Sequence, residues 1–203
     1  MDRPVKSRVR LVIYLVVLIA AAARAIDFTP TVTLKKLERF SVKVLTFSAG
    51  DKRASYKPPA GWTSEGTGDA LTLTPAEPAD AWMKFFSLDW SEEKTAKLDT
   101  PEAEAKWALG YLPSAAADVE IAETNESPFM LGIRPSREWI IKYQIEGIVH
   151  KTSVSRCEIS RGKRLVILMT ASAQNFEPFR QDGISSLFGW EWLMLLRRAS
   201  SLA

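Results

Sequence analysis

The sequence is poor in the side chains that most catalytic and metal sites use, since its 203 residues contain one histidine and one cysteine. A single cysteine, Cys157, excludes an intramolecular disulfide, so a hydrophobic core must stabilise the fold. We expect Cys157 to be buried, with a reactive or intermolecularly paired thiol as the alternative. His150 follows Glu146 by four residues, and two candidate ligands do not specify a metal site. We therefore expect no metal and no cofactor.

Motifs of the common enzyme classes are also missing. Residues 183–187, G-I-S-S-L, lack the final glycine of the G-x-S-x-G nucleophile turn. The sequence has neither a phosphate-binding nor a dinucleotide-binding glycine pattern. Acidic pairs such as Glu102 with Glu104 give no evidence of a shared cleft. A hydrolase with an unrecognised carboxylate site is therefore the least favoured function, and the chain is predicted to be noncatalytic.

The first 25 residues have the pattern of a secretory signal peptide. Four basic residues (Arg3, Lys6, Arg8 and Arg10) precede an uncharged run over residues 11–23, and small residues at 23 and 25 fit a peptidase site. A membrane-spanning helix needs about 20 apolar residues, and this run stops at 13. We expect cleavage near Ala25 and a secreted or periplasmic protein.

Removing this segment changes the charge of the chain. Residues 1–25 hold five of the 27 basic and one of the 24 acidic side chains. The remainder carries 22 and 23, so its net charge falls from +3 to −1. Nucleic-acid binding requires a basic surplus on the folded domain. The sequence therefore predicts no nucleic-acid partner.

Hydrophobic patterns in the remaining chain predict an α+β fold. Residues 81–90 and 165–173 are apolar on both faces at period two, which is typical of central strands covered on both sides. Residues 139–146 alternate as a strand with one core face. Thr100 and Pro101 begin a predicted helix that ends before Pro113. We expect a three-layer α/β/α sandwich around a central, mostly antiparallel sheet.

The other segments complete this scheme. Strands are expected at 40–47, 53–57 and 71–74, with a polar loop over 60–69. A second loop contains Pro128 and Pro135, and a polar strand over 149–159 leads into a turn at 160–164. The last element is expected to be a helix over 175–192. The predicted divisions are a signal peptide (1–25), an N-terminal strand extension (26–52), the main domain (53–192) and a C-terminal tail (193–203).

One part of this chain resembles a known family. The segment Y-K-P-P-A-G-W over residues 56–62, followed by L-T-L-T-P and W-M-K-F-F-S-L, is similar to the opening of PsbP-like domains. These domains occur in extrinsic photosystem proteins, in a Ran-binding import factor and in exported bacterial proteins. The order of elements over about 53–192 also matches. The resemblance implies an α/β/α sandwich that acts as a binding or accessory module, and it transfers no ligand site.

Two features are candidates for a partner-binding surface. Trp62 is the tryptophan best placed in a loop, where an exposed ring can bind sugars or peptides, although most tryptophans build the core. Five basic residues make the hairpin after residue 149 locally positive: Lys151, Arg156, Arg161, Lys163 and Arg164. They could contact an anionic partner or lipid headgroups. The alternative is edge protection, because lysine and arginine discourage strand-to-strand aggregation.

These observations favour an exported noncatalytic binding or accessory domain whose partner is an envelope protein or a small ligand. The alternative is a peripheral membrane module that uses the aromatic and basic segment 190–198, W-E-W-L-M-L-L-R-R. The same segment also suits a terminal helix packed on a sheet, and we favour packing.

Overall fold

The computed structural model describes residues 26–36, 38, 41–50, 52–90, 97–98, 100–126, 129, 131–132 and 136–194. The predicted signal peptide (1–25) lies outside the described residues, as does 195–203 of the predicted tail. Within the described part of the chain, no helix has the length and apolar character needed to cross a membrane.

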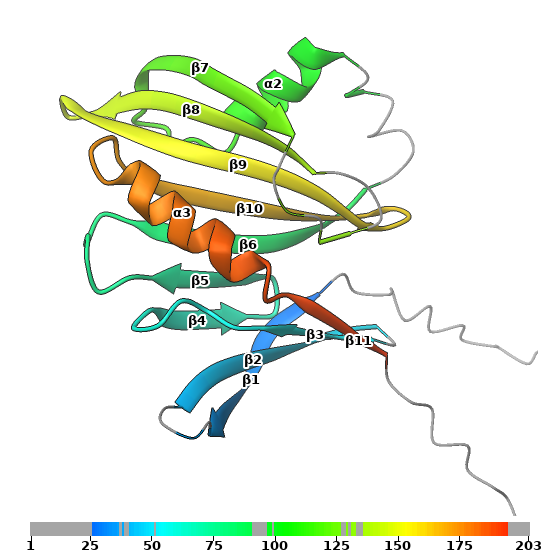
Figure 1. Cartoon of the computed structure of the whole chain (residues 1–203). Helices are drawn as coiled ribbons and strands as arrows, with labels where there is room; N and C mark the ends of the chain where they lie inside the picture. The colour runs from blue at the N-terminus through cyan, green and yellow to red at the C-terminus, as the bar shows by residue number, and fades with distance from the viewer. Residues whose placement is uncertain are drawn as a thin grey trace, which may run out of the picture.

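A seven-stranded antiparallel sheet forms most of the molecule (Figure 1). Each of its strands pairs antiparallel with its neighbours. In spatial order the strands are β4 (Thr63–Thr67), β5 (Ala70–Thr74), β6 (Trp82–Asp89), β10 (Lys163–Ser172), β9 (Ile148–Ser160), β8 (Arg137–Ile145) and β7 (Ala117–Glu126). The prediction of a mostly antiparallel sheet is confirmed, and the apolar segment 165–173 lies in its centre.

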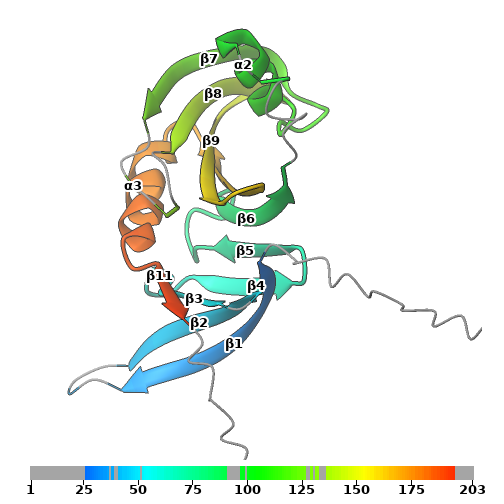
Figure 2. The same ribbon diagram turned by 90° about the vertical axis from the view of Figure 1, so that its right-hand side faces the viewer.

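A second, four-stranded sheet lies below the first in Figure 2. Its order is β1 (Asp27–Lys36), β2 (Ser41–Ala49), β3 (Lys52–Tyr56) and β11 (Glu191–Met194). The segment predicted as an N-terminal extension thus forms β1 and β2, and β2 pairs with β3, whose other edge pairs with β11. Phe28 of β1 and Phe47 of β2 are fully buried, and their rings pack edge to face at 5.4 Å.

Two short helices pack on opposite faces of the large sheet (Figure 2). Helix α2 (Pro101–Leu109) begins as predicted, because the Thr100 hydroxyl caps it by accepting a bond from the Ala103 backbone N–H. Helix α3 (Phe176–Leu187) crosses β10 and β9. Strands dominate, and among the described residues each face carries one short helix, so the expected three-layer α/β/α sandwich is not confirmed.

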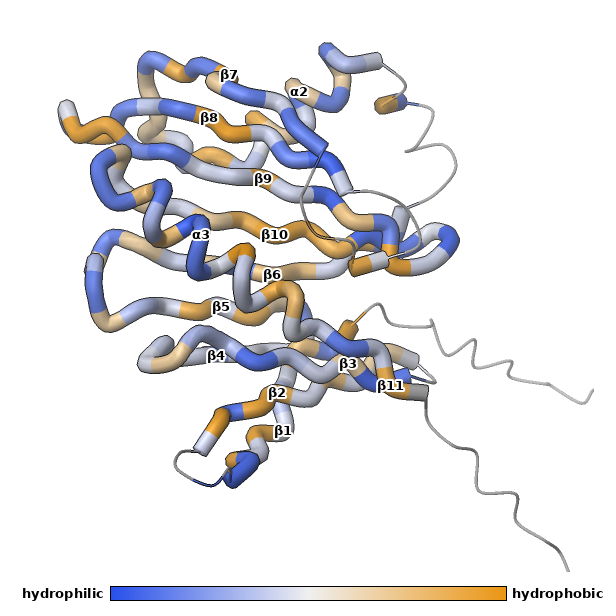
Figure 3. Tube along the Cα trace, viewed as in Figure 1, coloured by the Kyte–Doolittle hydropathy of each residue, from blue (hydrophilic) through white to orange (hydrophobic). Residues whose placement is uncertain are grey.

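Alternate residues of β10 supply two separate cores. Ile167 and Met169 lie under α3 and join the core of the small sheet, whereas Val166 and Leu168 pack under α2. All four are buried. Figure 3 shows the apolar β10 in the middle of the sheet and the polar β7 at its edge. The prediction that β10 is covered on both sides is confirmed.

Three expectations about single segments are wrong. The terminal helix ends at Leu187, and residues 191–194 form a strand because they pair with β3. Strand β4 lies inside the expected loop at 60–69, and β7 lies inside the expected loop before Pro128. The polar strand over 149–159 forms as β9, but it is central in the sheet, so Thr152 is buried and hydrogen-bonded to Tyr143 and Thr170. Pairing between neighbouring strands decided these elements, and their own hydrophobic pattern is weak.

Candidate functional site

A hollow of about 330 Å³ lies between the β3–β4 connection and the end of α3. The connection contributes Lys57, Pro59, Ala60 and Trp62, and the helix contributes Asp182, Ser185 and Ser186. Trp62, predicted as a binding residue, therefore lies at a concave surface. The helical residues at this hollow carry no sequence motif and were not predicted.

A tight turn brings Trp62 to this place. The Trp62 backbone N–H donates to the Pro59 carbonyl at 3.3 Å, and Gly61 has a φ of 79°. A type II turn needs positive φ at its third position, which glycine adopts without strain. This geometry explains the P-P-A-G-W segment in local physical terms.

The Trp62 indole is fixed by a second ring. It stacks on Phe179 of α3 with ring centroids 5.1 Å apart and ring planes within 8° of each other. Phe179 is buried, whereas Trp62 is partly exposed. A stacked, partly exposed ring is a rigid flat surface whose orientation is set before any ligand arrives.

The hydroxyl groups at the hollow already donate their protons in hydrogen bonds within the protein. Ser185 Oγ donates to the Gln181 carbonyl at 2.7 Å, and Ser186 Oγ donates to the Gly183 carbonyl at 2.6 Å. Tyr56 must therefore donate in its 2.6 Å bond to Ser186 Oγ. Burial raises the pKa of Tyr56, so this phenol keeps its proton. Both serines thus present acceptor lone pairs.

Two opposite charges border the hollow. The Lys57 side chain is 43% exposed, and its ammonium lies 3.9 Å from the Glu191 carboxylate. Asp182 is exposed on α3. The hollow therefore combines a flat aromatic surface, one cationic donor and several oxygen acceptors.

The five basic residues do not gather around Trp62. Lys151 pairs with Glu177 at 3.4 Å, whereas Arg161, Lys163 and Arg164 lie at the other end of the β9–β10 hairpin. Lys163 pairs with Asp89. Strands β9 and β10 are both interior to the sheet, so edge protection does not explain these residues. Their role in contacting an anionic partner stays a prediction.

Arg156 and Arg164 take part in the packing of the α2 side. The Arg156 guanidinium lies 5.5–5.8 Å from the ring centroids of Trp90, Trp107 and Trp139, and it pairs with Glu104 of α2. Arg164 lies 3.1 Å from Glu158 and 5.9 Å from the Trp90 ring. Cations that lie over aromatic faces and pair with a carboxylate stabilise such a half-buried layer.

His150 and Cys157 have structural surroundings. The His150 ring stacks on Tyr143 at 5.7 Å. Among the described residues, no group of three or more histidine, cysteine, aspartate or glutamate side chains could hold a metal ion. Cys157 is fully buried, as predicted, and burial raises its pKa to about 12. A thiol that stays protonated in this way is a weak nucleophile.

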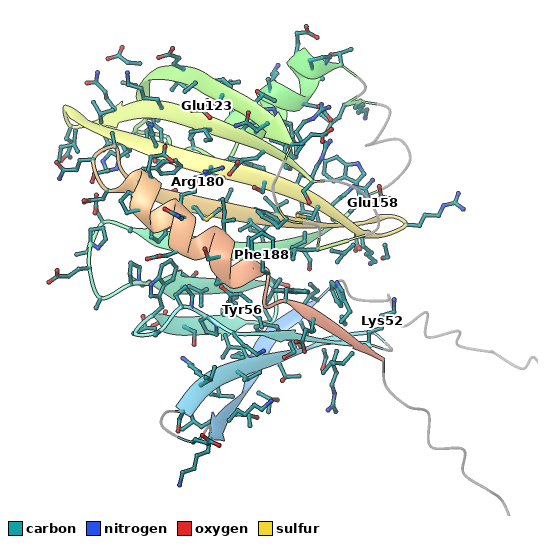
Figure 4. All side chains as sticks on the ribbon, in the orientation of Figure 1. Lys52, Tyr56, Glu123, Glu158, Arg180 and Phe188 are labelled. Atoms are coloured by element: carbon teal, nitrogen blue, oxygen red, sulfur yellow. The ribbon has the colours of Figure 1, made fainter. Side chains whose placement is uncertain are left out.

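A buried ion pair ties α3 to the sheet, and sequence reasoning missed it. Arg180 of α3, labelled in Figure 4, forms two hydrogen bonds to the carboxylate of Glu138 on β8. Ser153 donates a third hydrogen bond to this carboxylate. The Glu138 side chain is 0% exposed. Hydrogen bonding to Glu138 raises the pKa of Arg180. The alternation along β8 puts Glu138 on the face opposite Trp139 and Ile141, which the sequence predicts to be polar. Only the packed helix α3 shows that this face is covered.

The aromatic C-terminal segment is packed against the protein as far as the structure describes it. Trp190 is 8% exposed and stacks on Phe47 and Phe85, while Trp192 Nε1 donates to the Leu131 carbonyl at 2.7 Å. The basic end of this segment, Arg197 and Arg198, lies outside the described residues. The membrane-contact alternative stays a prediction.

No protein-family model matches this chain. The search of curated proteins also found no match.

Several solved structures do match part of the chain. Cyanobacterial PsbP from Synechocystis is 10% identical, with a TM-score of 0.49 over 68% of this chain and 85% of its own. LpqN of Mycobacterium tuberculosis, described as involved in cell envelope biogenesis, is 15% identical, with a TM-score of 0.43 over 86% and 96%. A protein from Bacteroides thetaiotaomicron is 10% identical, with a TM-score of 0.43 over 68% of this chain and 44% of its own.

A PsbP structure is thus among the solved structures to which this chain is similar, as the sequence resemblance led us to expect. With TM-scores below 0.5 and identities of 10–15%, these likenesses bring no ligand, partner or activity to this chain.

Proposed function

We propose that the mature chain is an exported, noncatalytic binding or accessory domain that holds its ligand or envelope-protein partner at the hollow beside Trp62. The observation that carries this proposal is the stacking of Trp62 on Phe179 at a concave surface. A partly exposed aromatic ring held rigid at a hollow loses little conformational entropy when it binds.

The chemistry around the hollow supports binding over catalysis. Its hydroxyl protons are used in internal hydrogen bonds, so neither Ser185 nor Ser186 is activated as a nucleophile by a neighbouring base. The buried carboxylate of Glu138 is bound by Arg180 and serves packing.

Photo-crosslinking from the hollow tests this function. A photoreactive amino acid replaces Lys57 in the exported protein, and a matched variant carries it at Glu120, which is exposed on the distant strand β7. We expect a discrete adduct, identified by mass spectrometry, from position 57 and none from position 120. Equal labelling from both positions would contradict the proposal, and so would substrate turnover that disappears in Asp182→Asn.

Export has its own test. Replacing Ala25 with a bulky residue should leave a precursor about 25 residues longer, because the signal peptidase accepts small side chains at this position. N-terminal sequencing of the exported wild-type protein should find Ile26 or a near neighbour. An intact Met1 on the exported form would refute cleavage.

A further inference from the structure

We infer that the hollow beside Trp62 binds a saccharide. This inference rests on the proposed function and names the class of ligand for the same site. It follows from three features of the hollow: the flat indole surface, the surplus of hydrogen-bond acceptors and the single ammonium group.

The acceptor surplus selects for a ligand rich in hydroxyl groups. The protons of Ser185 and Ser186 go to backbone carbonyls of α3, so these side chains offer only lone pairs. Asp182 adds two carboxylate oxygens. A ligand must therefore bring donors, and each hydroxyl of a sugar is a donor that can also accept from Lys57.

The Trp62 ring selects for a flat apolar face. Phe179 covers one face of the indole in parallel stacking, and Trp62 still lines the hollow. A pyranose ring carries an apolar C–H face and a rim of hydroxyls. The C–H face fits the indole, and the rim then lies within reach of Asp182, Ser185 and Lys57.

Other ligand classes fit these groups less well. A phosphate or a carboxylate would lie against Asp182 and two serine lone pairs, which repel an anion. A peptide that adds a strand needs a free strand edge, whereas this hollow is lined by a turn and a helix.

Fluorine NMR tests the inference at the residue that carries it. The mature protein is labelled with 5-fluorotryptophan, and Trp62→Phe assigns the Trp62 resonance among the seven tryptophans. The saccharide probes are maltotriose, cellotriose and tri-N-acetylchitotriose. Inorganic phosphate and a mixed peptide pool are added separately, to represent the other ligand classes. We expect at least one trisaccharide to shift the Trp62 resonance saturably.

Affinity measurements by calorimetry then test the roles of the groups. Asp182→Asn should weaken binding about tenfold, since hydrogen bonds to charged groups are the strong ones. Trp62→Phe should weaken it by about threefold to tenfold, because the ring is kept but its area shrinks. The control Glu120→Gln should bind as wild type. Asp182 is exposed, so its variant is expected to fold, which circular dichroism checks.

The outcomes separate the two proposals. If none of the three trisaccharides shifts Trp62, or if their binding is unchanged in both hollow variants, the saccharide inference is wrong. A Trp62 shift with phosphate or peptide alone would overturn the saccharide and leave the binding function standing. Failure of crosslinking from position 57 would overturn the binding function itself.

Discussion

The two faces of the large sheet are closed in different ways. Under α3, the core is continuous with the small sheet, and rings such as Phe28, Phe47 and Phe85 are fully buried. Under α2, the Arg156 guanidinium lies over the rings of Trp90, Trp107 and Trp139 and pairs with Glu104. Of these rings Trp107 is partly exposed. The same strand, β10, supplies buried apolar side chains to both faces.

The glutamate–arginine ion pairs on the two faces also differ. Glu138 is fully enclosed under α3, with Arg180 as its cation and Ser153 as a further donor. Glu104 under α2 has two cations, Arg137 and Arg156, and the Arg137 side chain is 48% exposed. Glu138 therefore depends on one cation, whereas Glu104, also buried, keeps a second cation when one is lost.

The largest expected effect tests this comparison of the two pairs. Arg180→Ala should lower the free energy of unfolding by about 3–5 kcal/mol, because it leaves a buried carboxylate unpaired. Arg137→Ala, the matched change on the other face, should cost about 1 kcal/mol or less, since Glu104 keeps Arg156. Urea denaturation of the mature domain measures both. Equal losses in the two variants would show that the faces do not differ in this respect.

Truncations in β10 test whether each face is a true core. Ile167→Ala and Leu168→Ala should each destabilise by about 2–5 kcal/mol, through lost burial and a residual cavity. The exposed control Glu120→Ala should stay within about 0.5 kcal/mol of wild type. If Leu168→Ala resembled this control, the α2 face would not be closed.

The two helix starts are a smaller test. Thr100→Ala should cost about 1 kcal/mol, because the Thr100 hydroxyl accepts from the Ala103 N–H. Asn175 makes no capping bond at the start of α3, and its side chain donates instead to Ser172 Oγ at 3.0 Å. Asn175→Ala should therefore cost about 0.5 kcal/mol, less than Thr100→Ala. Thermal unfolding followed by circular dichroism ranks the two. A larger loss in Asn175→Ala would contradict the capping assignment.

The smallest effect concerns pH and the α3 face. Burial raises the pKa of Cys157 from its ordinary value of 9.0 to about 12 in the folded protein. Between these values the unfolded chain releases the thiol proton and the folded chain keeps it, so stability falls as pH rises. From pH 8 to about pH 9.5 this loss should be about 0.8 kcal/mol.

Cys157→Ala should remove this part of the pH dependence, whatever its own stability. Urea denaturation at the two pH values compares the slopes of the two proteins. The same slope in both would mean that the thiol titrates normally, as it would if it were exposed.

The sequence alone determined the parts of the fold whose side chains are apolar and periodic. The runs at 81–90 and 165–173 predicted central strands, and Thr100 with Pro101 predicted the start of α2. The P-P-A-G-W segment predicted a break in the strands and marked Trp62 as the tryptophan best placed in a loop, and Trp62 lines the hollow. In each case a local preference and the final environment agree, so the pattern is visible in one short segment.

Only the tertiary structure decided the polar strands and the candidate site. Strand β9 reads as polar surface, yet its neighbours on both sides bury Ser153, Ser155 and Cys157. Residues 191–194 became a strand because β3 offers them a free edge. The Glu138–Arg180 pair and the hollow between Trp62 and Asp182 each join segments more than 40 residues apart in the sequence. Hydrophobic periodicity reports how one segment is covered, and it carries no information about which distant segment covers it.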